Sequence, residues 1–214
     1  MLSDLVFLSI LLGVLLVGST SAVGGGTPPS EMVQEREGLT GVDLGETSLP
    51  GSADLQVSGT ALTVEAAGRD LWDREDEAYF VQRMVRGDGV VVARIEALVR
   101  TDEWAKAGIM FREELASDSR NVCVVWTPRS LVALQYRSRK GDLTNTKHVA
   151  DIPSPVWLKL ERFGARFSAS VSLTGVRWRH VGQVELDLPD VLHAGVVVTS
   201  HQPSKRTTAI FTGV

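Results

Sequence analysis

The sequence predicts an all-β domain in which two antiparallel sheets pack face to face as a β-sandwich. Short runs rich in Val, Thr, Leu and aromatic residues recur along the chain and are broken about every ten residues by turn-forming residues. No segment from Leu39 onward keeps the apolar spacing of a long amphipathic helix. This combination is typical of a sandwich or a barrel, and one domain of two stacked sheets is the simplest solution.

Twelve such runs are the expected strands. They are Thr60–Ala67, Ala78–Val85, Val90–Val99, Ala105–Glu113, Asn121–Thr127, Leu131–Arg137, Thr144–Asp151, Val156–Arg162, Arg166–Leu173, Arg177–Glu185, Leu192–Ser200 and Thr207–Val214. The glycines between them can supply the positive φ angle that tight hairpins require: Gly59, Gly87, Gly141, Gly164 and Gly175.

Alternation within two of these runs assigns their faces, because successive side chains of a strand point to opposite sides of a sheet. One run places a core row at Val156, Leu158 and Leu160. Another places its core row at Ala107, Ile109 and Phe111. The opposite row of that second run mixes small, apolar and cationic residues: Lys106, Gly108, Met110 and Arg112. Such a mixed row indicates a sheet face that is partly covered or that binds a ligand.

Composition excludes several classes of protein. The 214 residues are 43% hydrophobic and 22% charged, close to an ordinary globular chain and unlike a disordered, collagen-like or coiled-coil protein. The formal net charge of -4 comes without a basic cluster, so nucleic acid is not an expected partner. The single cysteine, Cys123, excludes an internal disulfide framework and is expected to be a buried apolar residue.

The amino terminus resembles an export signal. Leu5–Val17 is apolar except for Ser9, and small residues follow it up to Ala22, as in a signal-peptide core and its cleavage site. We expect residues 1–22 to be a signal peptide, 23–38 a flexible linker and 39–214 the sandwich domain. The expected location is secreted, periplasmic or cell-surface, with no membrane attachment after cleavage. Retention as an anchor stays open, although the run is shorter than the span of about 20 residues that crosses a bilayer. Asp4 argues against an export signal, because such signals usually begin with a positive charge.

Several segments in a fixed order resemble one known family. The most specific is residues 104–113, WAKAGIMFRE. The others are GRDLW at 68–72, DEAYFV at 76–81, GDG at 87–89, VARI at 92–95, PVWLKLER at 155–162, SLTGVRW at 172–178 and GVVVTSH at 195–201. Together they resemble the secreted domain of unknown function also called regulation-of-enolase-like, within the concanavalin A-like lectin/glucanase superfamily. This resemblance implies a jelly-roll β-sandwich and implies no established activity. Thr174 departs from the family's pattern, which has Asp at that turn position.

No catalytic set is apparent in the sequence. Related sandwich glucanases carry Glu-x-Asp-x-x-Glu along one strand, and that spacing is absent here. The four histidines do not fall at metal-ligand spacing either. The acidic cluster from Asp70 to Glu77 leaves three interpretations: glycosidase carboxylates, a calcium site formed by Asp73, Asp76 and Glu77, or a solvated turn with local ion pairs. No other cofactor is expected.

The candidate ligand-binding residues are aromatic and polar side chains. Trp72 and Trp104 follow turns, where an indole can form an exposed platform for a sugar ring. Strand parity and the superfamily shape add five residues of one concave sheet face: Gln82, Met110, Arg112, Gln135 and His201. We therefore expect an exported, non-catalytic module that binds a carbohydrate chain or docks a partner protein. A hydrolase or lyase of the same superfamily and a purely structural envelope protein are the alternatives.

Overall fold

The computed structural model describes residues 38–55 and 61–214 of the chain. The expected signal peptide and the expected turn at Gly59 lie outside these residues. The expected linker also lies outside them, except for Gly38. No helix of the described residues has the length and apolar character needed to cross a bilayer.

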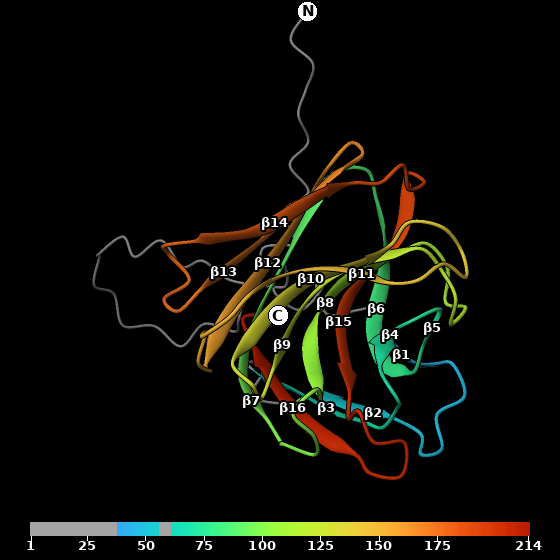
Figure 1. The fold of residues 1–214 in the computed structure, drawn as a ribbon, viewed down its shortest axis with the longest axis vertical. Coiled ribbons are helices and arrows are strands. Elements are labelled where there is room, and N and C mark those ends of the chain that lie inside the picture. Colours follow the sequence, from blue (N-terminus) through green and yellow to red (C-terminus); the bar gives the residue numbers. More distant parts are fainter. Residues whose placement is uncertain (1–37, 56–60) are drawn as a thin grey trace, which may run out of the picture.

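Two seven-stranded antiparallel sheets form the sandwich (Figure 1). The first sheet has the order β1 (Thr40–Leu44), β6 (Ala78–Arg86), β15 (Val191–Thr199), β8 (Lys106–Arg112), β9 (Asn121–Thr127), β10 (Leu131–Arg137) and β11 (Asn145–Val149). The second has the order β14 (Arg179–Glu185), β13 (Arg166–Ser172), β12 (Val156–Phe163), β7 (Gly89–Leu98), β16 (Thr207–Thr212), β3 (Ala61–Ala66) and β2 (Ser52–Leu55). A short hairpin joins β4 (Leu71–Trp72) to β5 (Glu75–Asp76).

All twelve expected strands are present, and their bounds agree with the prediction to within two residues. The predicted positive φ angles are confirmed at Gly87, Gly141, Gly164 and Gly175. Thr174 braces its turn, because its hydroxyl accepts hydrogen bonds from the backbone N–H groups of Val176 and Arg177 at 3.3 Å each.

The main core lies between the two sheets. The predicted core rows of β8 and β12 are confirmed, since Ala107, Ile109, Phe111, Val156, Leu158 and Leu160 are all buried there. Phe111 of the first sheet meets Phe167 of the second edge to face, with ring centres 5.7 Å apart. This apolar layer positions every strand that carries the site described below.

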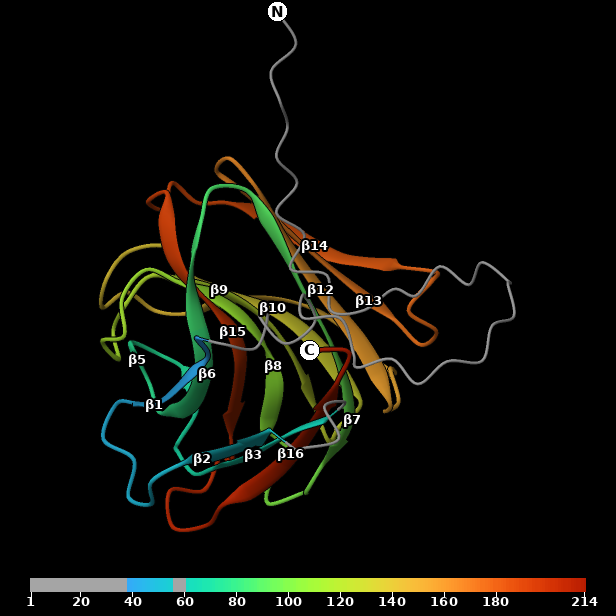
Figure 2. The same cartoon turned by 180° about the vertical axis from the view of Figure 1, so that it is seen from behind.

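A second, smaller apolar cluster lies on the outer face of the first sheet, the face turned away from the main core. Outward side chains of β6, β8, β9, β10 and β15 gather there with Leu71 of β4. Strands β8 and β9 are consequently buried on both faces. The β4–β5 hairpin therefore acts as a partial roof over this face, beside β6 and β1 in both views (Figures 1 and 2).

An ion cluster anchors this roof. The carboxylate of Asp76, on β5, accepts hydrogen bonds from Arg112 at 2.5 Å and from two nitrogens of Arg137 at 2.8 Å each. The Asn121 amide donates a further bond to Asp76 at 3.1 Å. All four residues are buried. Desolvation lowers the pKa of Arg112, and the charge of Asp76 opposes that shift.

Replacing Asp76 with Asn is expected to destabilise the fold strongly. Two buried guanidinium groups would lose their counter-charge, which costs about 3–5 kcal/mol in comparable buried pairs. The matched control is Asp190→Asn, because the Arg86–Asp190 pair is exposed, at 75% and 59% of the two side chains. That control is expected to cost less than about 1 kcal/mol. Urea unfolding of both variants measures the difference, and equal losses would contradict the role given to Asp76.

Candidate functional site

A cavity of about 530 Å³ opens on the outer face of the first sheet, next to the β4–β5 roof. We call it the indole cavity, because Trp72 and Trp104 both line it. Its other lining residues are Asp70, Lys106, Thr127, Leu131, Ala133, Gln135, Thr146, His148 and His201. Strands β8 to β11 supply the floor, while the hairpin and two loops supply the walls.

The two indoles are half exposed and held in place by their neighbours. Trp72 is 37% exposed at the end of β4, and Trp104 is 40% exposed in the turn before β8. The Trp104 backbone N–H donates to Asp102 at 2.8 Å, and this bond is the main cause of the lowered pKa of Asp102. The guanidinium of Arg129 lies 4.7 Å from the centre of the Trp104 ring, in cation–π geometry. Exposed aromatic surface is thus presented in a fixed orientation.

Two polar atoms in the cavity floor have no hydrogen-bond partner within the described part of the chain. They are Oγ1 of Thr127 and Oε1 of Gln135. Both residues are almost fully buried, with 1% and 4% exposure. An unsatisfied buried polar atom costs about 1–3 kcal/mol, so native structures rarely keep one without a reason. Two other buried atoms of the described residues lack a partner, Nε of Arg94 and Nε of Arg112, and neither arginine lines this cavity or the one that adjoins it.

A charged wall closes one side of the cavity. The ammonium of Lys106, which is 3% exposed, forms an ion pair with Asp70. The ring of His201 bridges two carboxylates, with Nε2 3.4 Å from Asp70 and Nδ1 3.2 Å from Asp102. Apart from the two histidines, Asp70 and Lys106 are the only acidic or basic residues among the described residues that line the indole cavity, and their charges are opposite.

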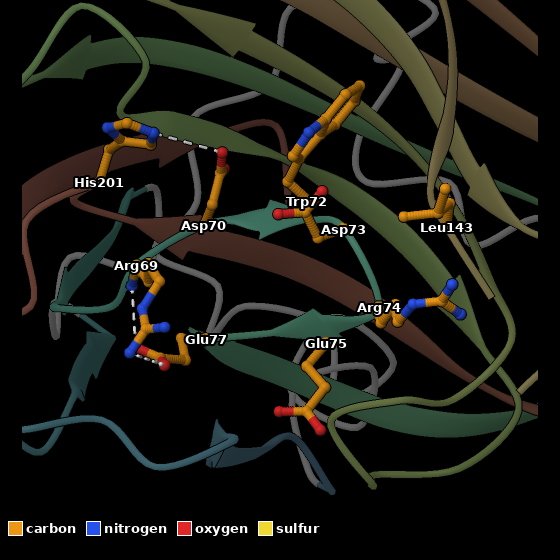
Figure 3. A pocket seen from close by; sticks show the side chains of 9 residues that line it. All are labelled: Arg69, Asp70, Trp72, Asp73, Arg74, Glu75, Glu77, Leu143 and His201. Atoms are coloured by element: carbon orange, nitrogen blue, oxygen red, sulfur yellow. Dashed lines mark hydrogen bonds and ion pairs between the residues drawn. The ribbon is translucent and has the colours of Figure 1, made fainter. Parts of the chain in front are cut away.

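A second cavity of about 640 Å³ adjoins the first. We call it the hairpin cavity, because most of its lining comes from the β4–β5 segment: Arg69, Asp70, Trp72, Asp73, Arg74, Glu75 and Glu77, with Leu143 and His201. Figure 3 shows the Trp72 indole between Asp70, which points to His201, and Leu143. The two cavities share Asp70, Trp72 and His201.

Four of the seven predicted ligand-binding residues come together in the indole cavity: Trp72, Trp104, Gln135 and His201. The other three share the outer face, as parity predicts, but they line neither cavity. Met110 and Arg112 are fully buried, Met110 in the apolar cluster with Leu71 and Arg112 against Asp76. Gln82 is 6% exposed and bonds to Thr40 and His193. The β4–β5 roof and strand β1 occupy the space that a ligand would need to reach them.

The predicted calcium ligands are not brought together. Both carboxylate oxygens of Asp76 accept hydrogen bonds from arginines, and Glu77 pairs with Arg69 at 3.4 Å. Across the described ranges, no group of three His, Cys, Asp or Glu side chains is arranged to hold a metal ion. Asp73 is an exposed turn residue, Glu77 forms a local ion pair, and Asp76 belongs to the buried ion cluster.

Comparison with known proteins identifies the fold. No family model matches the chain, and no curated protein matches it either. Among solved structures, a functionally unknown protein from Saccharomyces cerevisiae has 16% identity and a TM-score of 0.61, covering 80% of this chain and 92% of its own. The carbohydrate-binding module CBM66 from Bacillus subtilis has 15% identity and a TM-score of 0.52, covering 80% and 91%. A β-glucanase from Bacillus licheniformis has 7% identity and a TM-score of 0.53, covering 83% and 91%. The fold is thus the concanavalin A-like jelly-roll β-sandwich.

The thiol of Cys123 is expected to be unreactive in the folded protein. Cys123 pairs in register with Gln135 of the cavity floor, and burial raises its pKa to about 12. An unfolded cysteine ionises near about 8.5, so the unfolded chain binds fewer protons between these two values. The free energy of unfolding should therefore fall as pH rises through that window.

Labelling with iodoacetamide at pH 8.5 measures the reactivity of the Cys123 thiol directly. Labelling is expected only after denaturation in guanidinium chloride, and the Cys123→Ala variant supplies the blank. Rapid labelling in native buffer would contradict the buried position of this thiol.

Proposed function

We propose that the protein is a non-catalytic module that binds a glycan in the indole cavity. One observation carries this proposal: two half-exposed indoles line the same cavity as two buried polar atoms that lack partners. A sugar ring matches both features, since its C–H faces pack on an indole and its hydroxyl groups donate and accept hydrogen bonds.

The floor chemistry specifies a ligand with hydroxyl donors. The Oε1 atom of Gln135 is an acceptor, so its partner must donate a hydrogen, while the Thr127 hydroxyl can donate or accept. A purely apolar ligand would leave both atoms unsatisfied. A polyhydroxylated one removes the cost of burying them, and that gain adds to the binding free energy.

Within the indole cavity taken alone, the carboxylate arrangement supports a binding role over hydrolysis. Glycoside hydrolysis typically uses two carboxyl groups about 5–10 Å apart on either side of the bond that is cleaved. Asp70 is the one carboxylate among the described residues that line the indole cavity, and it is paired with Lys106 and His201. The likeness in fold to the CBM66 module, whose name describes a carbohydrate-binding module, agrees with this role.

The proposal extends to family and location. We assign the chain to the regulation-of-enolase-like domains on the segments quoted above, and we place it outside the cytoplasm on the signal-like residues 1–22. A glycan ligand is consistent with that location.

Replacing either cavity tryptophan with Ala is expected to weaken binding. The full chain is incubated with insoluble and soluble polysaccharides, and retention, tryptophan fluorescence and released reducing sugar are followed together. We expect retention without sugar release, unchanged by EDTA. Trp72→Ala and Trp104→Ala should each weaken retention at least tenfold, about 1.4 kcal/mol.

Phe163→Ala is the matched control, because Phe163 is an exposed aromatic residue (61%) on β12 of the other sheet. Its retention should equal that of the unmodified chain. Absence of retention on every polysaccharide would overturn the glycan proposal in favour of protein docking, and sugar release would overturn the non-catalytic part.

Gln135→Leu is expected to separate stability from binding. The substitution removes the unpartnered Oε1 atom at nearly unchanged volume, so the free energy of unfolding should stay constant or rise by up to about 1 kcal/mol. Retention on the polysaccharide should fall about tenfold. Urea unfolding and retention of the same preparation measure both effects. A strongly destabilised variant, or one that binds normally, would contradict the role given to Gln135.

A further inference from the structure

We infer that the glycan binds as a chain of uncharged sugar units that crosses Trp72 and occupies both cavities. This inference rests on the proposed function and adds the length and charge of the ligand. It starts from the three side chains that the two cavities share: Asp70, Trp72 and His201.

The two cavities lie side by side, because they share one wall, and we call the pair the groove. Each volume, about 530 and 640 Å³, is within the range of about 300–1,000 Å³ typical of small-molecule sites. A ligand confined to the indole cavity would use only the part of Trp72 that faces that cavity. Because Trp72 is 37% exposed and lines both, a chain that packs across it gains contacts in each.

The position of Trp72 is fixed well enough to serve two neighbouring subsites. Its backbone carbonyl accepts a hydrogen bond from Arg137 at 3.4 Å, and its neighbour Leu71 pairs in register with Asp76 of the buried ion cluster. Thr144, which follows Leu143 in the sequence, donates its backbone N–H to the Asp73 carbonyl at 2.8 Å. The segment next to Leu143 is thereby tied to the hairpin, so the far wall of the groove moves with Trp72.

Charge decides which chains fit the hairpin cavity. Four carboxylates and two guanidinium groups line it, a net charge of -2. Arg69 is paired with Glu77, and Arg74 donates to the carbonyl of Gly141 at 2.9 Å. The carboxylates of Asp73 and Glu75 have no hydrogen bond or ion pair with any other described residue. A uronic acid or a sulfated sugar would meet them as a like charge, whereas an uncharged unit would not.

Titration calorimetry against oligosaccharides of increasing length tests the inference. The probes are β-1,4-linked gluco-, xylo- and manno-oligosaccharides and β-1,3-linked gluco-oligosaccharides of one to six units, with oligogalacturonides as the anionic set. For at least one neutral series, affinity should rise at least tenfold between two and six units. The oligogalacturonides should bind at least tenfold more weakly than that hexamer.

Two equally exposed leucines provide a matched pair of variants. Leu143, 55% exposed, lines only the hairpin cavity, and Leu173, also 55% exposed, lies in the turn after β13. Leu143→Ala should weaken hexamer binding at least threefold and leave disaccharide binding unchanged. Leu173→Ala should change neither. The double variant Asp73→Asn, Glu75→Gln should bind neutral and anionic hexamers with affinities that differ less than they do for the unmodified protein.

The outcomes separate this inference from the proposed function. Two results would overturn the inference that the glycan occupies both cavities and would leave glycan binding in the indole cavity intact. They are an affinity that is already maximal for one or two units, and a Leu143→Ala effect that is equal at every length. Preferential binding of oligogalacturonides overturns the charge argument. If no oligosaccharide binds and no polysaccharide retains the protein, both the proposed glycan-binding function and the inference of a multi-unit ligand are overturned.

Discussion

The carboxylate of Asp76 lies between two arginine side chains that are buried at the same end of the first sheet. Without that carboxylate, Arg112 and Arg137 would be isolated charges in a desolvated space, which is unfavourable by several kcal/mol. The same contact fixes β5, and with it the hairpin that carries Trp72 and lines both cavities. The geometry of the candidate site thus depends on an ion cluster that is itself outside the site.

The roof divides the outer face of the first sheet into two parts with different chemistry. Under the hairpin, the face is closed and every strong charge is matched, by Asp76 and by loop carbonyls such as that of Ser119. Beyond the hairpin, over β9 and β10, the face is open and two polar atoms are unmatched. Of the buried polar atoms without a partner among the described residues, these two belong to residues that line a cavity, whereas Nε of Arg112 lies under the roof beside Asp76.

Local patterning was sufficient to predict twelve of the sixteen strands of the described residues, because alternation and turn glycines act over a few residues. Strands β1 and β2 are not among the twelve. Local patterning could not predict β4 and β5, which have two residues each and form through the contacts of Leu71 and Asp76 with distant strands. For the same reason, parity placed Met110 and Arg112 on the correct face but could not show that a roof covers them. Thr127 has the same parity, so its position on the outer face was predictable. Its place beside an open cavity was not, because it depends on where the hairpin ends.

A sheet face with its own apolar cluster also explains why the site can tolerate unmatched polar atoms. Strands β9 and β10, which carry Thr127 and Gln135, are fixed from both sides, by the main core and by the cluster around Met110 and Cys123. A floor held in this way cannot relax to give Thr127 and Gln135 new partners, since any shift would disturb close packing on the opposite face. The floor is therefore preorganised before a ligand arrives, and binding need not include the cost of ordering it. That rigidity makes the position of each unmatched atom, and not only its presence, informative about the hydroxyl groups that the ligand presents.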